Sequence, residues 1–163
     1  MAIQENDFPL TGTIVPAPAA ALIMQSPDQS YVMQRRDYAN GIFYPGHLGL
    51  FGGAYLEGEE FYDTAIREVK EETGLNLDGR ITYLTKMTLG FEPFGHGPVD
   101  RIFYSANLTH GELSEIAVTE GAGFEVVDVC KLLMEELVVP YDAFAIWMHC
   151  NVPNNQQGFD QGT

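Results

Sequence analysis

The sequence predicts an α/β fold, because segments typical of strands and segments typical of helices are interspersed along it. Short apolar runs bounded by turn residues are typical of strands, and a segment after residue 59 has the apolar period of a helix. The 163 residues are 45% hydrophobic and 12% aromatic, enough to fill a core and unlike a disordered chain. We expect one domain over residues 1–163, with mobile ends at about 1–12 and 151–163.

The expected elements follow one another with turn residues between them. Strands are predicted at residues 19–24 and 31–35, joined by a turn at 26–29 that contains proline and aspartate. After a loop rich in glycine and proline, at 40–49, the apolar run 50–53 leads towards the predicted helix. The later elements are strands at 81–89, 101–108 and 124–127, a short helix near 129–137 and a last helix at 141–149.

The helix predicted from about Glu60 to Thr73 carries the clearest periodic pattern. Its apolar residues recur at i, i+3, i+4 and i+7, which makes one buried stripe. Those residues are Tyr62, Ala65, Ile66 and Val69. Gly74 follows as a C-terminal stop.

Three glutamates lie on a neighbouring face of this helix. Glu68, Glu71 and Glu72 follow i, i+3, i+4 spacing, so their carboxylates are close together. Such pairs repel by roughly a few tenths of a kcal/mol each on a solvated helix. A solvated acidic face explains a run of this kind. A divalent cation also explains it, because Mg²⁺ takes oxygen ligands and bridges carboxylates to substrate phosphates.

The composition is strongly acidic, with 23 acidic against 8 basic residues and a formal net charge of -15. This balance argues against non-specific binding to a nucleic-acid polymer. The apolar run 14–24 is short and contains two prolines, so we expect no membrane span. Cys130 and Cys150 give no disulfide framework and fit a reducing cytoplasm. We expect each cysteine to be a small buried side chain.

The segment from Gly53 to Leu75 reads GAYLEGEEFYDTAIREVKEETGL and resembles the Nudix box. That box is the signature of enzymes that cleave nucleoside diphosphates linked to another group. The positions that carry the resemblance are Gly53, Glu59, Arg67, Glu68, Val69, Glu71, Glu72, Gly74 and Leu75. One departure precedes the box, because Phe51 stands where family members often have proline. The order of strands and helices fits the Nudix fold, a mixed β-sheet packed between α-helices.

The resemblance implies roles for the glutamates of the helix. The residues matching Glu68 and Glu72 are the principal metal ligands of the family, and the one matching Glu71 is a further ligand or helps to activate water. The carbonyl of the residue before the box glycine, here Gly52, often completes the ligand set. An acidic protein acting on an anionic diphosphate needs a cation between them. The resemblance therefore favours a metal site, with Mg²⁺ expected and Mn²⁺ as the alternative.

Other positions of the box are implied to be structural. Glu59 and Arg67 usually support the loop and the helix, and Arg67 is also placed to pair with Glu71 at i+4. Gly53 and Gly74 supply turns at the two ends of the segment.

Residues outside the box are candidates with a plainer alternative. Many Nudix enzymes carry an acid that reaches the metal or acts as a base in the region of Glu120, which is otherwise an ordinary loop acid. Arg35 and Arg36 follow a strand that usually borders the substrate cleft, where one contacts a phosphate or forms a surface ion pair. His47 sits where many members carry a residue near the substrate, although a structural loop histidine is the simpler interpretation.

Several aromatic side chains are interpreted mainly as core. Phe91, Phe94 and Phe103 are able to stack on a base or sugar, but core packing is the commoner use of any one of them. Trp147, on the last predicted helix, is expected in the core.

The resemblance implies a divalent-metal-dependent hydrolase in which water attacks a phosphorus of a diphosphate linkage. The expected substrate is a nucleoside diphosphate derivative of the nucleoside triphosphate, ADP-ribose or sugar nucleotide type. Two alternatives stay open: a non-catalytic nucleotide-binding or sensor module, and an isoprenoid diphosphate isomerase, which needs an active-site cysteine. A homodimer is common in the family, and the expected location is the cytoplasm.

Overall fold

The computed structural model of the chain describes residues 15–39, 42–92, 95–134 and 136–151. Its strands are β1 (Ala19–Gln25), β2 (Tyr31–Arg35), β3 (Leu48–Gly49), β4 (Phe51–Ala54), β5 (Thr82–Leu89), β6 (Val99–Asn107) and β7 (Phe124–Val127). Its helices are α1 (Phe61–Thr73), α2 (His110–Glu115), α3 (Val129–Met134) and α4 (Pro140–Asn151). The expected mobile ends, apart from residue 151, and Phe94 lie outside the described residues.

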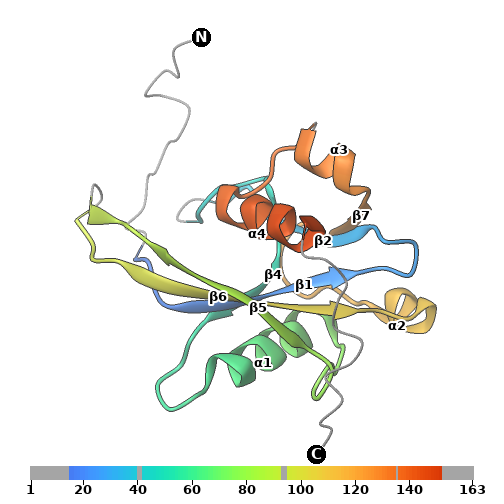
Figure 1. Cartoon of the computed structure of the whole chain (residues 1–163), viewed down its shortest axis with the longest axis horizontal. Helices are drawn as coiled ribbons and strands as arrows, with labels where there is room; N and C mark the ends of the chain where they lie inside the picture. Colours follow the sequence, from blue (N-terminus) through green and yellow to red (C-terminus); the bar gives the residue numbers. More distant parts are fainter. Residues whose placement is uncertain (1–14, 40–41, 93–94, 135, 152–163) are drawn as a thin grey trace, which may run out of the picture.

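The strands form one mixed sheet between helices. Its order is β3-β2-β1-β6-β5, with β4 also beside β1 and β7 also beside β2. β1 and β6 run parallel, whereas the other pairs are antiparallel. Helix α1 covers one face of the sheet and helices α3 and α4 lie on the other (Figure 1). The predicted fold class, a mixed sheet sandwiched between helices, is confirmed.

Strand β1 is apolar throughout because both of its faces are covered. Successive side chains of a strand point to opposite faces. Ala20 and Leu22 therefore pack with Val69 of α1, and Ala21 and Ile23 pack on the side of α4. This accounts for an apolar run that lacks the alternation of a half-exposed strand.

The same edge of β1 has two partners in succession, and this positions the candidate site. Its first residues pair with β4, with Ala21 opposite Gly52. Its last residues pair with β2, with Met24 opposite Val32. Gly52 of β4 and Gln34, near the end of β2, therefore both come within hydrogen-bonding distance of Glu72 at the C-terminal end of α1.

The sequence predictions missed two kinds of local structure. The end of the predicted 40–49 loop contains strand β3, and the run after it contains β4. Helix α2 was not expected, although a capping box marks its start: Thr109 accepts a hydrogen bond from the Glu112 N–H, and the Glu112 side chain accepts one from the Thr109 N–H.

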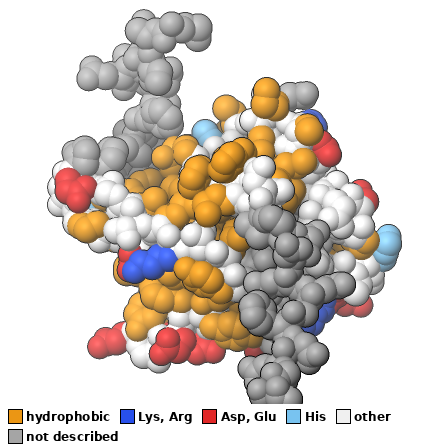
Figure 2. Space-filling view, in the orientation of Figure 1, with side chains coloured by type: hydrophobic (Ala, Val, Ile, Leu, Met, Phe, Trp, Pro, Cys, Tyr) orange, Lys and Arg blue, Asp and Glu red, His pale blue; other side chains and the backbone are white. Residues whose placement is uncertain are grey.

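The prediction that Trp147 lies in the core is wrong. Trp147 is 53% exposed and stacks on Phe144, with ring centroids 5.9 Å apart. Ala145 and Ile146 are the residues of α4 that face the sheet, so Phe144 and Trp147 fall on its outer side. Hydrophobic side chains accordingly reach the surface in the region of α4 (Figure 2).

The prediction of buried cysteines is also wrong, because Cys130 and Cys150 are both exposed; neither forms a disulfide, and Cys150 Sγ lies 3.2 Å from Tyr31 Oη. Cys130 is the second residue of α3, and Cys150 is the last residue but one of α4. No described helix has the length and apolar character that crossing a membrane requires.

Candidate active site

The loop before α1 is held by an arginine–carboxylate pair. Arg67 approaches Glu59 through two hydrogen bonds, Nε to Oε1 at 2.7 Å and Nη2 to Oε2 at 3.1 Å. Glu59 also accepts from Thr64 Oγ1 at 2.8 Å, and Arg67 Nη2 donates to the carbonyl of Ala54 at 3.1 Å. The hydrogen bonds from Arg67, the largest cause, lower the pKa of Glu59 to about 2. These contacts fix the path of the chain from β4 to α1.

Arg67 also touches two of the predicted metal ligands. Its Nη1 lies 2.6 Å from Glu68 Oε1 and 3.3 Å from Glu71 Oε2, the latter being the i, i+4 pair expected from the sequence. Glu71 is nevertheless 61% exposed, so its carboxylate faces solvent.

The carboxylate of Glu68 rests against the backbone of Gly53. A Cβ atom at Gly53 would lie 2.4 Å from Glu68 Cδ and 2.5 Å from Oε2. Only a residue without a side chain leaves room for Glu68 in this position.

Gly52 is required for a different reason. Its φ of 143° lies in a region that side-chain-bearing residues rarely adopt, and a Cβ would lie 2.2 Å from the Ala20 carbonyl oxygen on β1. The resulting close approach lets the Gly52 N–H donate to Glu72 Oε2 at 2.9 Å. The two glycines thus serve two different glutamates: Gly53 leaves space for the Glu68 carboxylate, and Gly52 donates a hydrogen bond to Glu72.

Glu72 is the most buried of the box glutamates, with 5% of its surface exposed. Its Oε1 accepts a hydrogen bond from Gln34 Nε2 at 3.3 Å. Burial is the main cause that raises the pKa of Glu72 to about 7, and the nearby charges of Glu68 and Glu120 add to it. The hydrogen bonds from the Gly52 N–H and from Gln34 oppose this rise. Among the described residues no lysine or arginine forms an ion pair with Glu72.

The segment that carries Glu120 is fastened to the C-terminal end of α1. Thr119 donates from its N–H to the Glu72 carbonyl at 3.1 Å and from Oγ1 to the Glu71 carbonyl at 2.8 Å. The Ala117 N–H donates to the Thr73 carbonyl at 3.0 Å. These bonds satisfy carbonyls that a helix leaves unpaired at its end, and they bring the exposed side chain of Glu120 near Glu72.

The two arginines after β2 have different surroundings. Arg35 is engaged by Glu125, with Nη2 to Oε1 at 2.5 Å, and by the Gly46 carbonyl at 3.0 Å. Arg36 donates from Nε to the Phe43 carbonyl at 2.7 Å. Within the described part of the chain Arg36 forms no ion pair. Arg35 therefore forms an ion pair, which was the alternative to a phosphate contact. Arg36 is the better candidate of the two for contacting a phosphate.

His47 lies in the same neighbourhood as Arg36. Its Nδ1 is 3.1 Å from the Pro45 carbonyl, and its ring centroid is 5.5 Å from that of Tyr44. The backbone joins the two residues, because the Arg36 N–H donates to the His47 carbonyl at 3.0 Å.

A buried pair that sequence reasoning missed lies beside Arg36. Asp142 of α4 is buried, with Oδ1 3.3 Å from Arg101 Nη2 and Oδ2 accepting from the Leu50 N–H at 3.0 Å. Burial raises the pKa of Asp142, and the charges of Arg101 and Arg36 oppose that rise. Leu50 is two residues before Gly52, so Asp142 and Glu72 accept hydrogen bonds from backbone N–H groups of the same short segment.

Aromatic rings surround the buried pair. The guanidinium of Arg101 lies over the rings of Tyr141 at 4.9 Å and Phe103 at 5.6 Å. Tyr44 meets Tyr141 edge to face at 6.0 Å. Phe103 is a fully buried core residue, as expected, while Phe91 packs on Phe43 at 5.7 Å. Arg101 and Asp142 are 41 residues apart, and no local spacing predicts such a contact.

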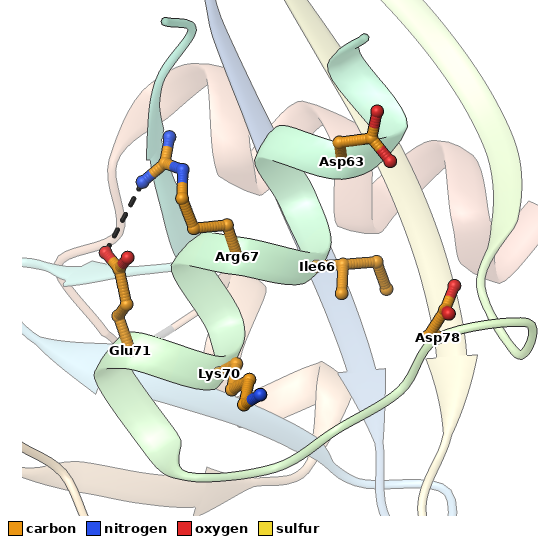
Figure 3. Close-up of a pocket in the computed structure, with 6 residues that line it drawn as sticks. All are labelled: Asp63, Ile66, Arg67, Lys70, Glu71 and Asp78. Carbon is orange, nitrogen blue, oxygen red and sulfur yellow. Dashed lines mark hydrogen bonds and ion pairs between the residues drawn. The ribbon is translucent and has the colours of Figure 1, made fainter. Parts of the chain in front are cut away.

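An open pocket of about 580 Å³ borders the outer side of α1. Arg67 points towards Glu71 on one side of it, and Asp63 and Asp78 lie on the other (Figure 3). Its remaining lining residues are Ile66 and Lys70. Glu72 is not among the residues that line this pocket.

A family match extends over most of the chain. The model of the NUDIX domain matches residues 15–148. The chain belongs to the NUDIX family. This membership confirms the family inferred from the box and the predicted enzyme class, a Nudix-type hydrolase. Enzymes of this family generally use divalent metals. No curated protein sequence matches this Nudix chain significantly.

Solved structures agree with the Nudix fold. A MutT NUDIX hydrolase from Burkholderia pseudomallei is 19% identical with a TM-score of 0.67, over 82% of this chain and 98% of that one. The NUDIX domain of Shewanella oneidensis NrtR, complexed with ADP ribose, is 16% identical with a TM-score of 0.65, over 89% and 92%. A C. elegans Ap4A hydrolase is 17% identical with a TM-score of 0.63, over 83% and 96%. At these identities the likeness shows the fold.

Proposed function

We propose that this Nudix protein hydrolyses a diphosphate linkage in a nucleoside diphosphate derivative with the help of a divalent cation. The observation that carries the proposal is the environment of Glu72. A buried carboxylate is costly unless a cation or hydrogen bonds compensate it, and this one also faces the negative charges of Glu68 and Glu120. A cation bound here would offset all of these costs together.

The donor set suits a hard divalent ion. Glu68, Glu72 and the Gly52 carbonyl offer oxygen atoms, which Mg²⁺ and Mn²⁺ prefer, and Glu71 or Glu120 would complete the set. As placed, no three acidic, histidine or cysteine side chains of the described residues gather closely enough to hold an ion. Arg67 contacts one oxygen each of Glu68 and Glu71, so binding would require these side chains to move closer together and present their other oxygens to the ion.

The reaction follows from these groups. When bound, the cation would polarise phosphate oxygens and lower the pKa of water. The oxygen of a water molecule bonds to phosphorus, the anhydride P–O bond breaks, and the leaving phosphate departs as an anion. Glu71 or Glu120 would accept the proton of the water, because both carboxylates are exposed beside Glu72. Glu59 and Arg67 would hold the loop between β4 and α1 in its position.

The substrate would extend from the glutamates towards Arg36. A guanidinium that forms no ion pair with any described residue suits a phosphate oxygen, and the neighbouring His47 and Tyr44 rings suit a sugar or base. An Ap4A hydrolase and a domain in complex with ADP ribose are among the similar folds, which favours a small nucleotide. We expect no nucleic-acid polymer and no membrane as partner, a cytoplasmic location, and either a monomer or a homodimer.

The test is a hydrolysis screen at neutral pH with Mg²⁺, in which chromatography separates and quantifies the products, because cleavage of a diphosphate linkage can yield phosphate monoesters or pyrophosphate and no inorganic phosphate. The panel contains nucleoside triphosphates, oxidised nucleotides, dinucleoside polyphosphates, ADP-ribose and sugar nucleotides, each with and without excess EDTA. The proposal predicts turnover of at least one nucleotide that stops in EDTA and returns with Mg²⁺ or Mn²⁺. Binding of a nucleotide without turnover, measured by calorimetry on the same panel, would favour the non-catalytic sensor and contradict the proposal.

A further inference from the structure

Gln34 joins separate segments of the chain at the candidate site. It is the residue before the last of β2 and is only 6% exposed. Its Nε2 donates to Glu72 Oε1 at 3.3 Å and to the Glu120 carbonyl at 3.2 Å. An amide nitrogen has two hydrogens, so both are used. One side chain thus links β2 to the end of α1 and to the segment of Glu120.

These bonds fix how the carboxylate of Glu72 is oriented. Gly52 N–H holds Oε2 at 2.9 Å while Gln34 holds Oε1. A carboxylate oxygen has two lone-pair sites, so each oxygen retains one after accepting these bonds. Glu72 is therefore clamped in one orientation but keeps its capacity to bind a cation.

The segment of Glu120 is pressed against Gln34 by its own backbone. Gly121 has a φ of 82°, and a Cβ there would lie 2.7 Å from the Arg35 carbonyl and 3.3 Å from Gln34 Cγ. The Ala122 N–H donates to the same Arg35 carbonyl at 2.8 Å. Thr119 fastens the segment to α1 from the other side, and Gln34 lies between these two attachments.

We infer that Gln34 is a positioning residue that orients the Glu72 carboxylate and holds the Glu120 segment beside it. The inference rests on the proposed function, because the orientation matters only if Glu72 binds the cation. Residues that hydrogen-bond to metal ligands typically change metal affinity or activity about 10- to 100-fold when they are replaced. Gln34 has the contacts of such a residue.

The experiment measures binding of Mn²⁺ alone, by electron paramagnetic resonance titration without substrate. Gln34→Met keeps the length and bulk of the side chain but donates no hydrogen bond. Gln34→Leu is a second variant of the same kind, in case one of them folds poorly. Gln25→Met is the matched control, because Gln25 lies at the far end of β1 and its Nε2 donates to the Gln29 carbonyl there.

We expect the dissociation constant for Mn²⁺ to rise about 10- to 100-fold in Gln34→Met and to stay unchanged in Gln25→Met. If Gln34 acts through Glu72, adding Gln34→Met to Glu72→Gln will weaken Mn²⁺ binding no further. Hydrogen exchange of the Ala117 and Thr119 amides, measured without metal, should become faster in Gln34→Met.

Three results would overturn the inference. Unchanged Mn²⁺ affinity in Gln34→Met, with faster exchange at Thr119, would make Gln34 a structural residue only and leave the proposed function standing. Equal effects of Gln34→Met with and without Glu72→Gln would show that it does not act through Glu72. Absence of Mn²⁺ binding by the wild type would instead remove the proposed cation site itself, and the inference with it.

Discussion

The carboxylate of Glu68 occupies the space that a side chain at Gly53 would fill. A Cβ at Gly53 would come within 2.4 Å of Glu68 Cδ, yet the atoms it would meet belong to the end of a flexible side chain. The absence of a side chain at Gly53 therefore allows the Glu68 carboxylate to take its position.

Gly53→Ala should accordingly impair activity more than folding. The added methyl group displaces Glu68, and misplacing a catalytic group by about 1 Å can cost roughly 100-fold in rate. We expect kcat to fall by about 10- to 100-fold while the free energy of unfolding changes by less than about 1 kcal/mol. Steady-state kinetics and urea unfolding of the same preparation measure both effects. A stable variant with wild-type kcat would contradict the role assigned to Glu68.

Gly52→Ala, unlike Gly53→Ala, should strongly destabilise the folded protein. Its Cβ would meet the backbone carbonyl of Ala20 at 2.2 Å, and the φ of 143° strains any other residue. Backbone cannot move aside as a side chain can, so we expect the free energy of unfolding to fall by at least about 2 kcal/mol. Urea unfolding checks this value, and a loss no greater than that of Gly53→Ala would show that the β1–β4 contact is looser than described.

The Glu59–Arg67 pair should make stability depend on acid pH. The pKa of Glu59 is lowered from 4.5 to about 2 in the folded protein. Its contribution is therefore present above about pH 4.5 and is lost as the pH falls towards 2. Glu59→Gln should lower Tm at pH 7 and flatten the decline of Tm between pH 5 and pH 3. Glu57→Gln, in the exposed part of the same loop, is the control and should keep the wild-type slope. An unchanged slope in Glu59→Gln would assign the acid sensitivity to other pairs, such as the ion pair of Glu112 with Arg80, whose hydrogen bond lowers the pKa of Glu112 to about 2.

Arg36 should contribute to substrate binding more than to stability. It forms no ion pair in the described part of the chain, so its charge is available to a phosphate. We expect Arg36→Met to raise KM about tenfold, the loss of one charge-assisted hydrogen bond. Tm should fall only modestly, through loss of the bond to the Phe43 carbonyl and of a positive charge near buried Asp142. Lys86→Met, which breaks the surface pair with Asp100, is the control. An unaltered KM in Arg36→Met would leave Arg36 outside the substrate site.

The sequence predicted the parts of the site that one helix determines. The spacing of Glu68, Glu71 and Glu72 on α1, and the glycines before it, are local, so periodicity and the box were enough. The strands at 19–24 and 31–35 were predicted for the same reason, because their apolar runs are bounded by turn residues.

Contacts between distant segments were beyond that reasoning. Nothing in the local sequence shows that Asp142 meets Leu50 and Arg101, because tertiary packing decides it. Gln34 gave a weak signal, since the two-residue period places it on the same face as Val32, which packs towards α1. A polar residue on a covered face needs a hydrogen-bond partner, and here that partner is Glu72.

The most direct test of the account compares Glu72→Gln with the wild type on the best substrate of the screen. Exposed Glu115 of α2 supplies the matched control Glu115→Gln. We predict that kcat falls by at least about 1000-fold in Glu72→Gln, as expected for loss of a group needed in the transition state. Glu115→Gln should keep wild-type kcat, and EDTA should abolish the activity of both active proteins. Turnover by Glu72→Gln within tenfold of the wild type, or wild-type turnover that survives EDTA, would contradict the account.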